Sequence, residues 1–177
     1  MKKLLVVRAA IAAVVAAVIT FTQAHNASIG LISVLGYATA MVAIEIISVV
    51  RIDDRMLKGT VIRLAASVII LGSLIGYMFT AQNRSYELLT LNVVIACYGF
   101  MGIEVFRAAR NKFFKTVEGR DHVIVAAINV AMLAVYLMDF AGIYRLGEVP
   151  AVGIFGAYAA VLAVFWGLKA FDPKQAG

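Results

Sequence analysis

The sequence has very few of the residues from which redox and metal sites are built. Cys97 is the only cysteine, and the two histidines, His25 and His122, lie far apart in the chain. A single cysteine excludes an intramolecular disulfide, and these residues form no zinc or redox motif. We therefore predict that the protein uses no metal and no cofactor.

Catalytic motifs are also missing. The chain contains no Gly-x-Ser-x-Gly, no His-Glu-x-x-His and no glycine-rich phosphate loop before Lys and Ser or Thr. The segments between its apolar stretches are too short to form a soluble catalytic domain. The prediction is a protein that is not an enzyme. A membrane enzyme acting on lipid ranks last, because no nucleophile–base pair is apparent.

Charged residues are scarce, whereas apolar residues are abundant. Only 15% of the chain is charged and 63% is hydrophobic, against roughly 45–50% apolar residues in soluble domains. A soluble fold of this composition could not cover itself with polar surface, but a bilayer removes that requirement. The composition therefore predicts an integral membrane protein.

Six apolar stretches are each long enough to cross a hydrocarbon core of about 30 Å. They lack the period-2 alternation of barrel strands, so helices are favoured. The predicted fold class is all-α, a single transmembrane domain over 1–177. We place its helices near residues 4–23, 28–50, 60–80, 88–107, 122–142 and 149–170.

Lysine and arginine are unevenly divided between the two sides of the predicted bundle. Of the 16 such residues, only Arg84 and Arg145 fall on one side. The others are Lys2, Lys3, Arg8, Arg51, Arg55, Lys58, Arg63, Arg107, Arg110, Lys112, Lys115, Arg120, Lys169 and Lys174. Cytoplasmic loops carry such an excess, so both termini are predicted to be cytoplasmic. The basic charge is thus a topology signal that also suits anionic membrane lipids, and no nucleic acid partner is expected.

The first 24 residues also resemble a secretory signal peptide. Lys2 and Lys3 precede an apolar run, and Thr22-Gln-Ala24 matches a small-x-small cleavage site. Arg8 shortens the uninterrupted apolar run, so we expect this segment to be retained as the first helix.

The six stretches show a weak internal repeat with a period of about 60 residues. Glu45 and Glu104 are 59 residues apart, and each is followed six residues later by arginine, Arg51 and Arg110. We predict three helical hairpins, covering about 4–51, 60–110 and 122–171.

This pattern resembles the HdeD-like family of small bacterial membrane proteins. The resemblance is carried by Gly72-x-x-x-Gly76, by Tyr98-Gly-Phe-Met-Gly-Ile-Glu104-Val-Phe-Arg107 and by the segment Gly156–Phe171. Positions 45 and 104 depart from the family pattern, because they hold glutamate in place of glycine. The resemblance implies a bacterial inner-membrane location and a link to acid resistance, and it brings no catalytic residues.

Ionisable residues inside membrane helices are rare and suggest a function by default. Arg8, Glu45, Arg63 and Glu104 are expected at one depth near the cytoplasmic face. The simplest pairing is Arg8 with Glu45 and Arg63 with Glu104, although pairing across the hairpins is equally allowed. Such pairs either fix helix packing or form a polar vestibule, and the first interpretation is favoured.

Two polar residues of the fifth stretch define a possible polar path. Asp139 lies near its outer end, and Asn129 lies about 15 Å further in by helical rise. An aspartate that meets water or Arg145 is the simpler interpretation of Asp139. Gly72 and Gly76 match a close-packing motif of membrane helices, here more for internal packing than for oligomers.

The sequence therefore predicts a non-enzymatic membrane protein of structural or stress-response type, acting as a homo-oligomer or as a subunit of a membrane assembly. The alternative is a small ion, proton or solute channel or transporter, with Glu45, Glu104 and Asp139 lining the route.

Overall fold

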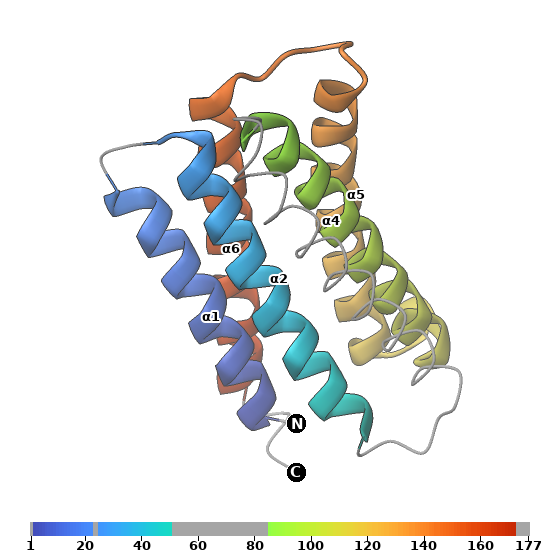
Figure 1. The fold of residues 1–177 in the computed structure, drawn as a ribbon. Helices are drawn as coiled ribbons and strands as arrows, with labels where there is room; N and C mark the ends of the chain where they lie inside the picture. Colours follow the sequence, from blue (N-terminus) through green and yellow to red (C-terminus); the bar gives the residue numbers. More distant parts are fainter. Residues whose placement is uncertain (1, 23–24, 51–84, 173–177) are drawn as a thin grey trace.

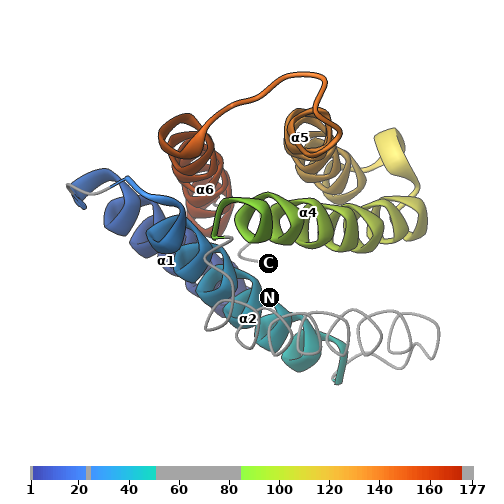
Figure 2. The ribbon, with the colours of Figure 1, turned by 45° about the horizontal axis from the view of Figure 1, so that its top comes forward.

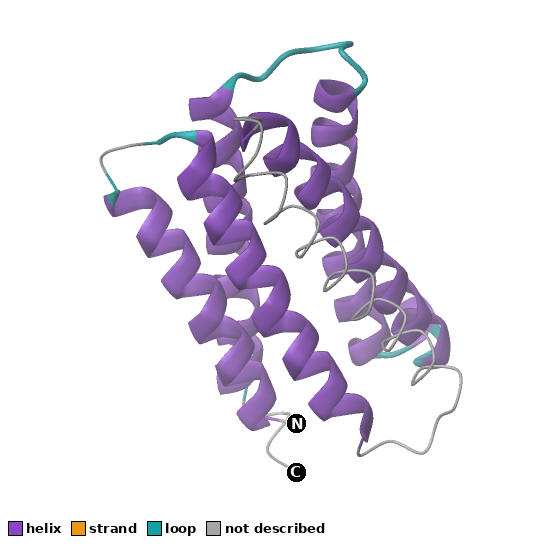
Figure 3. Ribbon diagram, viewed as in Figure 1, coloured by secondary structure: helices purple, strands orange, loops and turns teal. Residues whose placement is uncertain are grey.

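The computed structural model describes residues 2–22, 25–50 and 85–172. These residues form five long helices: α1 (Lys2–Phe21), α2 (Ala27–Val50), α4 (Ser85–Arg110), α5 (Val117–Phe140) and α6 (Glu148–Phe171). A short 3-10 helix, η1 (Phe113–Lys115), lies between α4 and α5. Within the described ranges there is no strand, as Figure 3 shows.

All five long helices have the length and apolar composition needed to cross a membrane. Their most apolar windows have mean hydropathies from 1.8 to 2.6, and helices of 20 residues or more can span the hydrocarbon core. The all-helical prediction is confirmed for five of the six stretches. The stretch predicted at 60–80, with Arg63, Gly72 and Gly76, lies outside the described residues.

The helices pack as a bundle in which α1 lies along α6 and α4 lies along α5. The central helix α2 contacts α1, α4 and α6. Helices α5 and α6 follow each other in the chain but make few contacts, and Figure 2 shows them standing apart beneath their connector. The segment predicted as a third hairpin is therefore splayed in the described bundle.

One end of the bundle holds the starts of α1 and α5 and the ends of α2, α4 and α6 (Figure 1). We call it the basic end. Its described cationic side chains are Lys3, Arg8, Arg107, Arg110, Lys112, Lys115, Arg120 and Lys169. At the opposite end, Arg145 is the one lysine or arginine that the structure describes.

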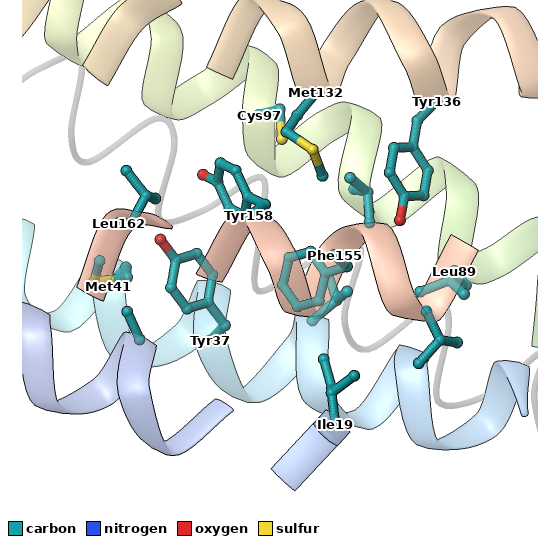
Figure 4. Packing of buried hydrophobic residues seen from close by; sticks show 14 of the residues in the cluster. Ile19, Tyr37, Met41, Leu89, Cys97, Met132, Tyr136, Phe155, Tyr158 and Leu162 are labelled. Atoms are coloured by element: carbon teal, nitrogen blue, oxygen red, sulfur yellow. The ribbon is translucent and has the colours of Figure 1, made fainter. Parts of the chain in front are cut away.

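Small and aromatic residues build the core between the helices. In α6, a Cβ on Gly156 would lie 2.7 Å from the Cγ2 of Ile19, so glycine lets α1 approach closely. Deeper in the bundle, the rings of Tyr37, Phe155 and Tyr158 meet with centroids 5.8–6.1 Å apart. Figure 4 shows these rings among the aliphatic side chains, so that α2 and α6 are joined by an aromatic cluster.

Candidate functional site: a buried charge network

Two glutamates lie inside the bundle near the basic end. Glu45 of α2 is 4% exposed and Glu104 of α4 is 5% exposed. Each follows a buried isoleucine, Ile44 or Ile103, on the inward face of its helix. Burying a carboxylate without a partner is costly, so the surrounding cations decide whether this arrangement is stable.

Glu45 is shared by two arginines from different helices. Arg8 of α1 donates from Nη2 to Oε1, and Arg107 of α4 donates to both carboxylate oxygens, at 3.1 Å for Oε1. Ser48, one turn along α2, is 3.3 Å from Oε2 and also meets Arg107 at 3.2 Å. The structure thus brings Arg8 and Glu45 together, and it adds a cross-helix partner that the simplest pairing lacked.

Glu104 has two partners near the start and end of the α4–α5 connection. Arg107 donates to its Oε1 at 3.1 Å, and His122 Nδ1 of α5 lies 2.5 Å from its Oε2. Arg63, the partner expected for Glu104 from the sequence, lies outside the described residues. Arg107 was expected at the helix boundary, and no partner was expected for His122. The three-residue spacing of Glu104 and Arg107 on one helix was the available signal for the first contact.

The network also reaches α6. The guanidinium carbon of Arg8 lies 5.9 Å from the ring centroid of Trp166, within cation–π range. Lys169 and Asp121 form an ion pair at 2.6 Å between α6 and α5. Polar contacts at the basic end therefore join all five long helices.

Formal charge in the network is balanced by two arginines against two glutamates, with His122 as a further hydrogen-bond partner. Removing two ions from water costs several kcal/mol each, and their attraction offsets this only when geometry and hydrogen bonding are good. Here each carboxylate oxygen has at least one charged or imidazole partner. Because the desolvation cost offsets much of the attraction, the main effect of such a network is to fix how the helices are oriented, and its net contribution to the free energy of unfolding is smaller.

A small cavity lies next to the two carboxylates. Its space for the centre of a water molecule is about 10 Å³, which is room for about one water. Tyr158 donates to the Asn129 Oδ1 at 2.9 Å, and the Asn129 Nδ2 donates to the Val125 carbonyl at 2.8 Å. The polar residues lining the cavity are Tyr37, Glu45, Glu104, Asn129 and Tyr158.

Asp139 belongs to a separate cluster at the opposite end. Tyr86 of α4 donates to its Oδ2 at 2.7 Å, and the Leu146 backbone N–H donates to its Oδ1 at 3.0 Å. The Gly147 N–H in turn donates to the Tyr86 hydroxyl at 3.0 Å. Asp139 therefore fastens the α5–α6 connector to α4, whereas Asn129 lies with the glutamates.

Comparison with protein-family models, with curated proteins and with solved structures finds no match for this chain.

Proposed function

We propose that this chain is a non-enzymatic multipass protein of a bacterial cytoplasmic membrane, with a structural or stress-related role in a larger membrane assembly. The observation that carries the proposal is the charge balance of the buried network. Because Glu45 and Glu104 are paired with Arg8, Arg107 and His122, the network fixes how the helices meet. The HdeD-like resemblance makes acid resistance the form of stress to be tested.

The orientation in this proposal has both termini in the cytoplasm. It is supported by the crowding of lysine and arginine at the basic end, which follows the bias of cytoplasmic loops. A cysteine-accessibility assay can test it. In a Cys97→Ala background, cysteines placed at Lys115 and at Arg145 should react with a membrane-impermeant thiol reagent from opposite sides of the membrane. Labelling from the same side would contradict the topology.

The structural role is tested by reconstituting the purified chain in liposomes. We expect proton and potassium fluxes no greater than those of protein-free vesicles, because the carboxylates are held by cations from neighbouring helices. A flux that depends on protein and is lost in Glu45→Gln or Glu104→Gln would overturn the proposal. In cells, the survival benefit that the wild-type chain gives in acid should be lost in Arg107→Leu. The amount of folded protein in the membrane should fall in parallel.

A second candidate is a small proton, ion or solute pathway, and the cavity is the observation that favours it. Glu45 and Glu104 share this space with Asn129 and Tyr158, so polar groups continue inward from the charge network. The test is acidification of vesicles containing a pH-sensitive dye. If Glu45→Gln, Glu104→Gln and Asp139→Asn all leave the rate unchanged, these residues do not line a route.

A further inference from the structure

The connection from α4 to α5 exposes aromatic and basic side chains side by side at the basic end. Phe114 is 70% exposed, Val117 57% and Phe113 43%. Lysine and arginine side chains are exposed between and beside them. We call this the connector surface, and its residues are Lys112, Phe113, Phe114, Lys115, Val117 and Arg120.

The connector surface has a fixed backbone. The Thr116 hydroxyl donates to the Asn111 carbonyl at 2.5 Å and accepts from the Gly119 N–H at 2.9 Å. Gly119 is buried, and a Cβ there would lie 2.0 Å from the Phe113 carbonyl oxygen. Only glycine allows the connector to lie this close to α5.

Two consecutive residues of the connector adopt left-handed conformations without being glycine. The φ angles are 57° at Lys112 and 47° at Phe113, a region that L-amino acids other than glycine rarely adopt because Cβ crowds the following carbonyl oxygen. The packing around Gly119 holds them there. The turn therefore presents the phenylalanine and lysine side chains in a defined arrangement.

The position and chemistry of this surface indicate its partner. It lies between the end of α4 and the start of α5, which is the level of the lipid headgroups for helices that cross a membrane. Aromatic side chains are enriched at that level. It carries three cations, and Glu118 is the one exposed acid in the segment 112–120. Basic residues beside membrane spans attract anionic lipid. An acidic soluble protein would match the charge, but the place of this surface between two helices that can cross a membrane favours lipid.

We propose that the connector surface binds anionic phospholipid, with Phe113 and Phe114 at headgroup level and Lys112 and Lys115 on the lipid phosphates. The inference rests on the membrane location in the proposed function. To the general attraction between basic residues and anionic lipid, it adds a specific binding element, the α4–α5 connection.

The test uses the purified full-length chain and native mass spectrometry with phosphatidylglycerol or phosphatidylcholine as the added lipid. Wild-type protein should bind phosphatidylglycerol more tightly. Lys112→Gln and Lys115→Gln should each weaken that binding about fivefold, from about 1 kcal/mol per cation near the surface. Lys3→Gln removes an exposed charge at the same end from α1, and as the matched control it should change binding less than twofold.

A further variant separates a lipid from a soluble anion. Phe114→Ser should weaken phosphatidylglycerol binding. Inorganic phosphate should compete with the lipid to the same extent in the wild type and in the Phe114→Ser variant. Equal affinity for the two lipids, equal losses from Lys3→Gln and Lys112→Gln, or no effect of Phe114→Ser would each overturn the proposal. Circular dichroism of each variant checks that its helices are folded. If the wild-type protein shows no lipid preference and vesicles containing it show no protein-dependent flux, the lipid proposal fails and the proposed structural role stands.

Discussion

Replacing Arg107 by leucine is expected to destabilise the bundle by about 3–5 kcal/mol, the range for removing one member of a buried ion pair. The Arg107 guanidinium donates to both oxygens of Glu45 and to one oxygen of Glu104. Without it, two carboxylates that are at most 5% exposed would keep only Arg8 and His122 as partners. The leucine would fill part of the space but would leave the excess negative charge buried.

The assay is reversible unfolding in mixed micelles, with the denaturing detergent fraction raised and helicity followed by circular dichroism. Arg145→Leu is the matched control, because Arg145 is exposed at the opposite end and such substitutions usually stay within about 0.5 kcal/mol. A free energy of unfolding for Arg107→Leu within 1 kcal/mol of wild type would refute the reasoning, since it would mean that water already solvates the carboxylates.

A second substitution tests the cause. If excess negative charge is responsible, Glu104→Gln should cost less in the Arg107→Leu background than in the wild-type protein. Contacting residues commonly show coupling energies of 0.5–3 kcal/mol, and this pair should lie in that range. Strict additivity of the two substitutions would show that Arg107 acts through packing of its aliphatic stem.

The positions of the five described helices could be predicted from the sequence because bilayer thickness sets a similar length for every span. The apolar runs located the five described helices, and counting along them placed Glu45 and Glu104 at one depth. The start of α5 was predicted at 122, but the helix begins at Val117. Thr116 caps it there by accepting a hydrogen bond from the Gly119 N–H, and the polar first turn carries no apolar signal.

The partners of the polar residues could not be predicted in the same way. The three-residue spacing of Glu104 and Arg107 could be read in the sequence, but Arg107 was assigned to the connector. In the structure Arg107 belongs to α4, which continues to Arg110. His122 reaches Glu104 only because the α4–α5 connection is compact. Asp139 meets Tyr86 and a backbone N–H of the next connector, a contact set by how α4 packs against α5.

The remaining predictions concern hydrogen bonding and close packing away from the charge network. Tyr86→Phe should lower the free energy of unfolding by about 1–3 kcal/mol, because Asp139 and a connector N–H each lose a hydrogen-bond partner. Protease cleavage in the α5–α6 connector should then become faster than in the wild type. Unchanged cleavage would contradict this, and Tyr144→Phe is the control at an exposed tyrosine. Gly156→Val should cost about 1–3 kcal/mol by overpacking, measured by the same micelle unfolding. A Cβ at Gly156 would meet an α1 isoleucine at 2.7 Å, whereas at Gly153, three residues earlier on the same helix, it would meet nothing within 4 Å. Gly153→Val is therefore the matched control, and equal stabilities of the two variants would mean that α1 does not pack on α6 through this glycine.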